Sequence, residues 1–174
     1  MRRLFFGAVV SAGLVACAGT RDAREPGEKL GTFHVTGKLV ATSCGKALDP
    51  WRFDVRLSRE GSTLYWIQGA LPIAGKLDAQ SRVRLDARAE AVVEKKDPRR
   101  GIEGCTMRRI DALDATLTGE PPTGFEASLV YRFEMASGDC STQLSMAGGE
   151  YDVLPCTMTY ALSAERAQTP APAR

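Results

Sequence analysis

The stretch that decides the fold class is Trp51-Arg52-Phe53-Asp54-Val55-Arg56-Leu57. Apolar side chains occupy every second position, and charged side chains occupy the positions between them. Successive side chains of a β-strand point to opposite faces, so a period of two is typical of a strand with one buried face and one solvated face. The stretch therefore predicts a strand of an antiparallel sheet.

The same period of two recurs along most of the chain. Seven further segments have the length and the apolar spacing of strands: 31–42, 64–67, 73–77, 82–93, 105–117, 125–135 and 156–163. Short polar connections separate them, and no segment has a convincing helical period. An antiparallel meander of about eight strands commonly closes into a barrel, which removes exposed sheet edges. We expect an all-β barrel, with a two-sheet sandwich as the alternative.

Two segments depart from simple alternation. The run after Cys105 slips in phase at Arg109-Ile110-Asp111, which predicts a β-bulge at that point. The inward row of another strand consists of Ala87, Ala89 and Ala91, and because alanine favours helices a helix is the alternative there. If this segment is a strand, its small inward side chains could leave space inside a barrel.

The N-terminal segment has the features of an export signal. Arg2 and Arg3 precede a short apolar region, which is shorter than the roughly 20 residues that a membrane-spanning helix needs. The region ends in Leu14-Val15-Ala16-Cys17, which resembles the lipobox of bacterial lipoproteins. The resemblance implies a signal peptide at residues 1–16 and acyl chains on Cys17. The alternative is an ordinary secretory signal beside a chance cysteine.

The resemblance also implies attachment to a membrane, and the composition of the rest of the chain predicts how it is divided into segments. Residues 17–30 are polar and are expected to form the lipidated N-terminus and a flexible tether to a single β domain at 31–164. Residues 165–174 are rich in proline and alanine and are expected to be a disordered tail. Because Ala18 stands where aspartate commonly favours inner-membrane retention, we expect the cell envelope, at the outer membrane, as the location.

The remaining cysteines are Cys44, Cys105, Cys140 and Cys156, and four cysteines allow three pairings. An exported domain meets an oxidising compartment, so two disulfides are expected. If the strands alternate in direction, all four cysteines lie at one end of the barrel. Cys105–Cys140 then flank neighbouring strands, and Cys44–Cys156 meet if the last strand pairs with the first. The absence of a Cys-x-x-Cys motif makes a metal site the less favoured interpretation.

Catalytic chemistry has little support in the sequence. The single histidine, His34, is expected on a solvated face, and no nucleophile elbow or phosphate-binding glycine loop is present. We therefore predict no catalytic residue, no metal and no cofactor. Catalysis by carboxylates such as Asp111 and Asp114 is the remaining alternative.

The charge balance counts against two classes of partner. The chain has 23 Lys+Arg and 21 Asp+Glu, and removal of the signal with Arg2 and Arg3 leaves 21 of each. A near-neutral domain gives no reason to expect nucleic acid as a partner or electrostatic attachment to a membrane. Attachment by lipid is the expected contact with the membrane.

The domain also resembles the lipocalin-like barrels loosely. That family usually has a glycine followed two residues later by tryptophan near its first strand, and here the segment is Gly31-Thr32-Phe33, with phenylalanine in place of tryptophan. Eight-stranded barrels are packed solid or hold one small ligand. The aromatic residues expected to line the interior are Trp51, Phe53, Trp66, Phe133 and Tyr160.

These observations lead to two functional hypotheses. The first is a lipid-anchored, non-enzymatic envelope protein with a binding or structural role, whose barrel takes a small apolar ligand. The alternative is an envelope assembly or protein-interaction module that docks a partner through its outer surface.

Overall fold

A computed structural model of the protein describes residues 22–168. The predicted signal peptide and the predicted lipidation site Cys17 lie outside the described residues, as do residues 169–174 of the predicted tail.

The described residues form one sheet of eight strands in which every neighbouring pair is antiparallel. The strands are β1 (Glu28–Thr42), β2 (Trp51–Glu60), β3 (Thr63–Ile67), β4 (Ile73–Lys76), β5 (Arg82–Glu94), β6 (Cys105–Thr118), β7 (Gly124–Gly138) and β8 (Cys156–Arg166). Three short 3₁₀ helices lie in the connections: η1 (Pro98–Arg100), η2 (Ser141–Gln143) and η3 (Ser145–Ala147). β1 begins three residues before the predicted domain boundary at residue 31, and β8 extends to Arg166.

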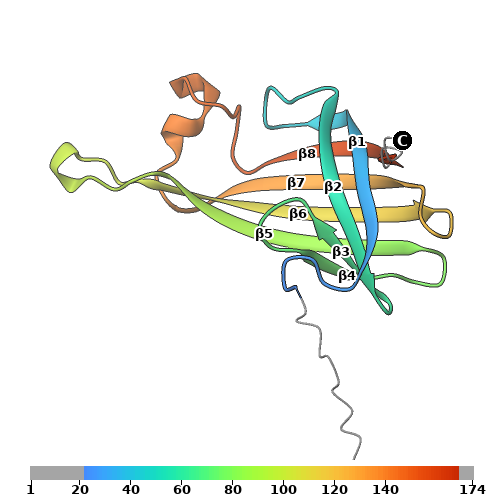
Figure 1. The fold of residues 1–174 in the computed structure, drawn as a ribbon. Coiled ribbons are helices and arrows are strands. Elements are labelled where there is room, and N and C mark those ends of the chain that lie inside the picture. The colour runs from blue at the N-terminus through green and yellow to red at the C-terminus, as the bar shows by residue number, and fades with distance from the viewer. Residues whose placement is uncertain (1–21, 169–174) are drawn as a thin grey trace, which may run out of the picture.

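The sheet is nearly closed into a barrel, as Figure 1 shows. Its strand order is β4-β3-β2-β1-β8-β7-β6-β5, so each strand lies beside its neighbour in sequence and β8 pairs with β1. The two outer strands, β4 and β5, meet through an isolated bridge between Leu77 and Val83. The predicted all-β meander is confirmed, and a single curled sheet replaces the two-sheet alternative.

The apolar core fills one end of this barrel. Phe33 of β1 and Phe125 of β7 are fully buried at its centre, with ring centroids 5.8 Å apart. Val55, Leu57 and Leu162 surround them from the flanking strands. Burial of each such side chain contributes about 1.5–3 kcal/mol relative to exposure, so this end of the barrel holds the strands together.

The other end of the sheet is uneven, because β5 has 13 residues and β4 has four. β5 is a strand along its whole length, so the helical alternative for the alanine-rich segment is wrong. The expected inward row of alanines is also corrected. Ala87 is half-buried, whereas Ala89 and Ala91 are exposed, because β3 and β4 are too short to cover that part of β5.

The bulge predicted at residues 109–111 is absent from the β6–β7 and β5–β6 ladders at that point. The register of β6 against β7 shifts instead between Thr106 and Met107, and it is regular from there to the end of β6. Arg109 and Asp111 therefore face the same side as Leu113, which is the inside of the barrel. The charges interrupt the apolar row without any slip of the backbone.

The two disulfides are Cys44–Cys156 and Cys105–Cys140, which is the pairing expected from the strand order. The first joins the end of β1 to the start of β8, and the second joins the start of β6 to the connection after β7. Both lie at the end of the barrel opposite the core. Disulfides persist in oxidising compartments, so they indicate an extracytoplasmic location. Among residues 22–168, no helix has the length and apolar character needed to span a membrane.

Removal of the two disulfides is expected to reduce stability unequally. Cys44 and Cys156 are 112 residues apart in sequence, and Cys105 and Cys140 are 35 apart. Loop-closure entropy then gives losses of about 5 kcal/mol for C44A/C156A and about 4 kcal/mol for C105A/C140A. Urea unfolding of both double variants measures these free energies. Four free thiols in the unreduced protein, detected by mass spectrometry, would contradict the pairing.

Candidate functional site

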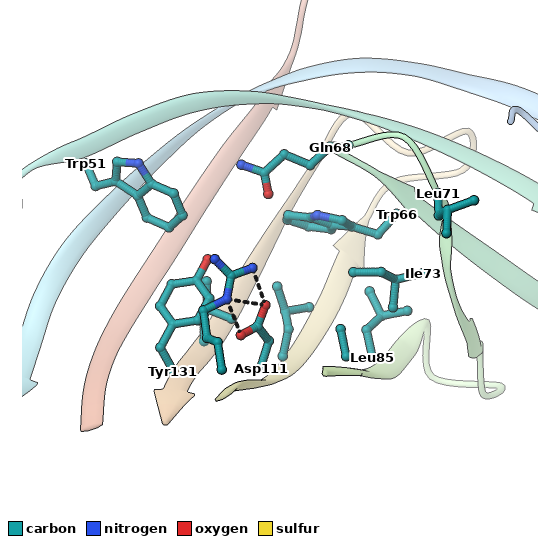
Figure 2. Close-up of a pocket in the computed structure, with 13 residues that line it drawn as sticks. Trp51, Trp66, Gln68, Leu71, Ile73, Leu85, Asp111 and Tyr131 are labelled. Atoms are coloured by element: carbon teal, nitrogen blue, oxygen red, sulfur yellow. Dashed lines mark hydrogen bonds and ion pairs between the residues drawn. The ribbon is translucent and has the colours of Figure 1, made fainter. Parts of the chain in front are cut away.

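A pocket of about 430 Å³ lies above the core, where the uneven strands leave the barrel open. One wall comes from β3 and the β3–β4 connection, and the other comes from β5, β6 and β7, as Figure 2 shows. Leu85, Leu113 and Leu129 connect the pocket to the buried core. The other lining residues are Trp51, Trp66, Gln68, Gly69, Leu71, Ile73, Ala87, Arg109, Asp111 and Tyr131.

Aromatic side chains form much of the pocket wall. Trp51 at the start of β2 and Trp66 of β3 lie on opposite sides of the space in Figure 2, and Tyr131 of β7 lies below Trp51. The ring centroids of Trp51 and Tyr131 are 5.9 Å apart. Phe53 packs behind this wall, with its ring centroid 4.2 Å from that of Trp51 and 6.2 Å from that of Trp66. The aromatic cluster therefore has limited freedom to collapse into the pocket.

The structure places the five predicted lining residues in different parts of the barrel. Trp51 and Trp66 line the pocket. Phe53 does not line it, but its ring packs against the rings of both tryptophans. Tyr160 is buried in the core, and its hydroxyl donates a hydrogen bond of 3.1 Å to the carbonyl oxygen of Leu48.

Phe133 lies away from this pocket, in a small apolar cluster around Cys105–Cys140. Its ring centroid is 5.4 Å from that of Tyr151, and the two residues line a smaller hollow on the exposed part of β5 to β7. The expectation that Phe53, Phe133 and Tyr160 line one interior space is therefore corrected. A period of two places these residues on the inward face, but it gives no indication of their height along the barrel.

An ion pair between Arg109 and Asp111 occupies the inner face of β6 within the pocket. Arg109 Nε donates to Asp111 Oδ1 at 2.8 Å and to Oδ2 at 3.1 Å, and Arg109 Nη2 donates to Oδ2 at 2.8 Å. The guanidinium carbon lies 5.0 Å from the centroid of the Tyr131 ring. A bidentate ion pair and an aromatic contact together hold the guanidinium in one orientation.

The two partners of the ion pair differ in their access to solvent. The Arg109 side chain is 47% exposed and the Asp111 side chain is 14% exposed. Burial raises the pKa of Asp111 above its ordinary value, and the hydrogen bonds and charge of Arg109 oppose that increase. The arginine therefore keeps free surface, and it lines both this pocket and the smaller hollow beside Phe133, whereas both oxygens of the carboxylate are already bonded.

From the sequence, Asp111 was named only as an alternative catalytic carboxylate and Arg109 only within an expected bulge. Their ion pair inside the barrel was not predicted, because most charged residues were assigned to outward faces. Strict alternation from Cys105 to Leu117 is the signal that could have identified them, since every odd residue in that range faces inward. Gln68 was also missed. It lies in the β3–β4 connection, and its amide extends over the space between the two tryptophans in Figure 2.

The other charged candidates lie on the outer surface. His34 is exposed, as predicted, and its Nδ1 lies 2.7 Å from an Asp54 carboxylate oxygen. Arg108 bridges Glu90 and Glu134 on the outer face, with distances of 2.8 and 2.9 Å. Within residues 22–168, no group of three or more histidine, cysteine or acidic side chains could hold a metal ion.

Comparisons with protein families, curated proteins and solved structures gave no match to this chain. The compatibility with a lipocalin-like fold therefore depends on the antiparallel eight-stranded meander.

The environment of Tyr131 predicts a loss of stability at alkaline pH. Burial, with a smaller contribution from the negative charge of Asp111, raises the pKa of Tyr131 to about 12. Between the usual tyrosine pKa of about 10 and this value, the unfolded chain releases the proton before the folded protein does. Unfolding free energy should fall as pH rises through this range. Tyr131→Phe should reduce the slope in urea titrations, and an unchanged slope would contradict the assignment.

Proposed function

We propose that this protein is a non-enzymatic binding module of the cell envelope that holds a small ligand in the open end of its barrel. The observation that carries the proposal is the pocket of about 430 Å³ between Trp51, Trp66 and Tyr131. Its volume lies in the range typical of small-molecule sites, and it combines apolar walls with a few convergent polar groups.

The polar groups favour binding over catalysis. Among residues 22–168, Asp111 is the only carboxylate that lines the pocket, and both of its oxygens accept hydrogen bonds from Arg109. General acid–base catalysis by carboxylates needs a group that is free to exchange a proton with a substrate. The arrangement fixes the ion pair in place, which suits recognition of a ligand.

The polar lining also refines the expected ligand. The sequence suggested an apolar ligand, but a purely apolar molecule would cover Arg109 without replacing its contacts with water, which is unfavourable. An amphipathic ligand fits better. Its apolar part would lie against the aromatic walls, and its polar part would reach the ion pair.

Attachment to the membrane by acyl chains on Cys17 is part of the proposal. The lipobox resemblance of Leu14-Val15-Ala16-Cys17 supports it, and the extracytoplasmic location indicated by the disulfides is compatible with it. Two or three acyl chains anchor a protein stably without any help from charge. The proposed location is the outer membrane.

Filling the pocket should block ligand binding. Ala87→Phe places a large ring beside Asp111 in the pocket, whereas Ala91→Phe adds the same ring on the same strand face beyond it. The Ala87→Phe protein should bind 2-naphthamide, a flat neutral probe, on the order of tenfold more weakly than the wild type. Affinity is measured by equilibrium dialysis.

The Ala91→Phe control should retain affinity within about twofold, and urea unfolding confirms that both variants fold. Equal affinity of the wild type and the Ala87→Phe protein for 2-naphthamide would show that the probe binds outside this pocket. Native mass spectrometry of the wild type that finds no co-purifying molecule, together with no binding of the probe, would argue against a binding function.

Replacement of the proposed lipidation site should detach the protein from the membrane. Cys17→Ser removes the only sulfur in the lipobox, so the acyl-modified N-terminal peptide should disappear from the mass spectrum and the membrane-bound fraction should fall by more than about tenfold. Ala18→Ser, one residue further along, should leave both measurements unchanged. A wild-type protein with an unmodified Cys17 would contradict the lipoprotein assignment.

A further inference from the structure

We infer that the ligand of this pocket is an amphipathic anion whose carboxylate-type head binds the free edge of Arg109. The inference rests on the proposed function, and it specifies the chemical class of the ligand. The apolar body of the ligand lies between Trp51 and Trp66, above the ion pair.

The first argument concerns which charge is available to a ligand. Asp111 is 14% exposed and both of its oxygens are bonded to Arg109, so it has little capacity to receive a cation. Arg109 is 47% exposed, and its Nη1 has no hydrogen-bond partner among the described residues. Nη2 uses one of its two N–H groups for Asp111. The donors that remain point to an anionic partner.

The second argument concerns geometry. Asp111 engages the guanidinium from the Nε and Nη2 side, and the Tyr131 ring lies against its face. The edge that carries Nη1 and the second N–H of Nη2 is not used by Asp111, and Arg109 lines the pocket. Two adjacent guanidinium nitrogens match the two oxygens of a carboxylate. Because the side chain is already held in place, binding an anion requires little further ordering.

The third argument concerns the rest of the pocket. In the part of the chain that the structure describes, Arg109 is the only cationic side chain that lines the pocket, and Gln68 is the only side chain with amide donors there. The other lining side chains are apolar or aromatic, apart from Asp111. A ligand with one anionic head at the ion pair and one apolar body between the tryptophans therefore matches the chemical character of the lining. A ligand with several charges would leave some of them in contact with apolar walls.

The test compares three probes of nearly equal shape: 2-naphthoate, 2-naphthamide and 2-naphthylmethylammonium. They differ in the charge of the head group, which is negative, neutral and positive. Affinities for the lipidated protein in phosphatidylcholine nanodiscs are measured by equilibrium dialysis against empty nanodiscs. The naphthoate should bind on the order of tenfold more tightly than the amide, and the ammonium probe should bind most weakly.

The double variant R109Q/D111N identifies the group responsible. It replaces the ion pair with two amides of similar size, so no unpaired charge remains in the pocket. Its affinity for 2-naphthoate should fall about tenfold, while its affinity for 2-naphthamide should stay within about twofold. Arg132→Gln is the matched control, because Arg132 lies on the outer face with Glu134 and should change neither affinity.

The outcomes separate this inference from the proposed function. If the wild type binds the three probes equally, or prefers the ammonium probe, the inference of an anionic ligand is wrong. The proposal that the pocket binds a small ligand is retained in that case. If R109Q/D111N loses binding of both 2-naphthoate and 2-naphthamide, the loss is attributed to the pocket of the variant rather than to its charge. The charge preference is then decided by the three affinities of the wild type, which do not depend on the folding of the variant. Failure of all three probes to bind the wild type overturns both proposals.

Discussion

The short length of β3 and β4 is the constraint on which the rest of the structure depends. The six other strands have between 10 and 15 residues, whereas β3 has five and β4 has four. The sheet can therefore close at the end where Leu77 meets Val83, but it has no strand left to cover the remainder of β5. Full closure would remove the free edge and also the opening. The pocket exists because closure is incomplete.

The same constraint allows charge on the inner face of β6. A charge inside a fully closed barrel of this size would lose its water, at a cost that an ion pair seldom recovers. Beside the opening, Arg109 keeps almost half of its surface in contact with solvent, and Asp111 is satisfied by the guanidinium. The apolar core lies below this level and contains none of the charged pairs. The stabilising core and the pocket proposed to bind a ligand thus lie at different heights of one barrel.

Much of the fold could be predicted because alternation and turn residues are local signals. The strands around Trp51 and Phe125 and the pairing of Cys44 with Cys156 follow from period and topology. The site was harder, because its position depends on the relative lengths of strands that are distant in sequence. Whether an inward residue meets core, pocket or solvent is decided by what lies across the barrel. For that reason Tyr160, which was expected in the cavity wall, lies in the core, and Arg109, which was expected only within a bulge, lies in the pocket.

An ion pair on an inner face is a poor means of stabilising a protein, since apolar residues of the same volume commonly do as well or better. A structural explanation of Arg109 and Asp111 is therefore weak. The positions next to them on the inner row, Met107 and Leu113, are buried and apolar, and the backbone there would accept further apolar side chains. The physical property that the pair adds is a partly dehydrated set of hydrogen-bond donors on Arg109, held in place by the carboxylate of Asp111. Such a set contributes most when a complementary group arrives with an apolar body that excludes the remaining water. The cost of keeping the pair is most simply explained by that role.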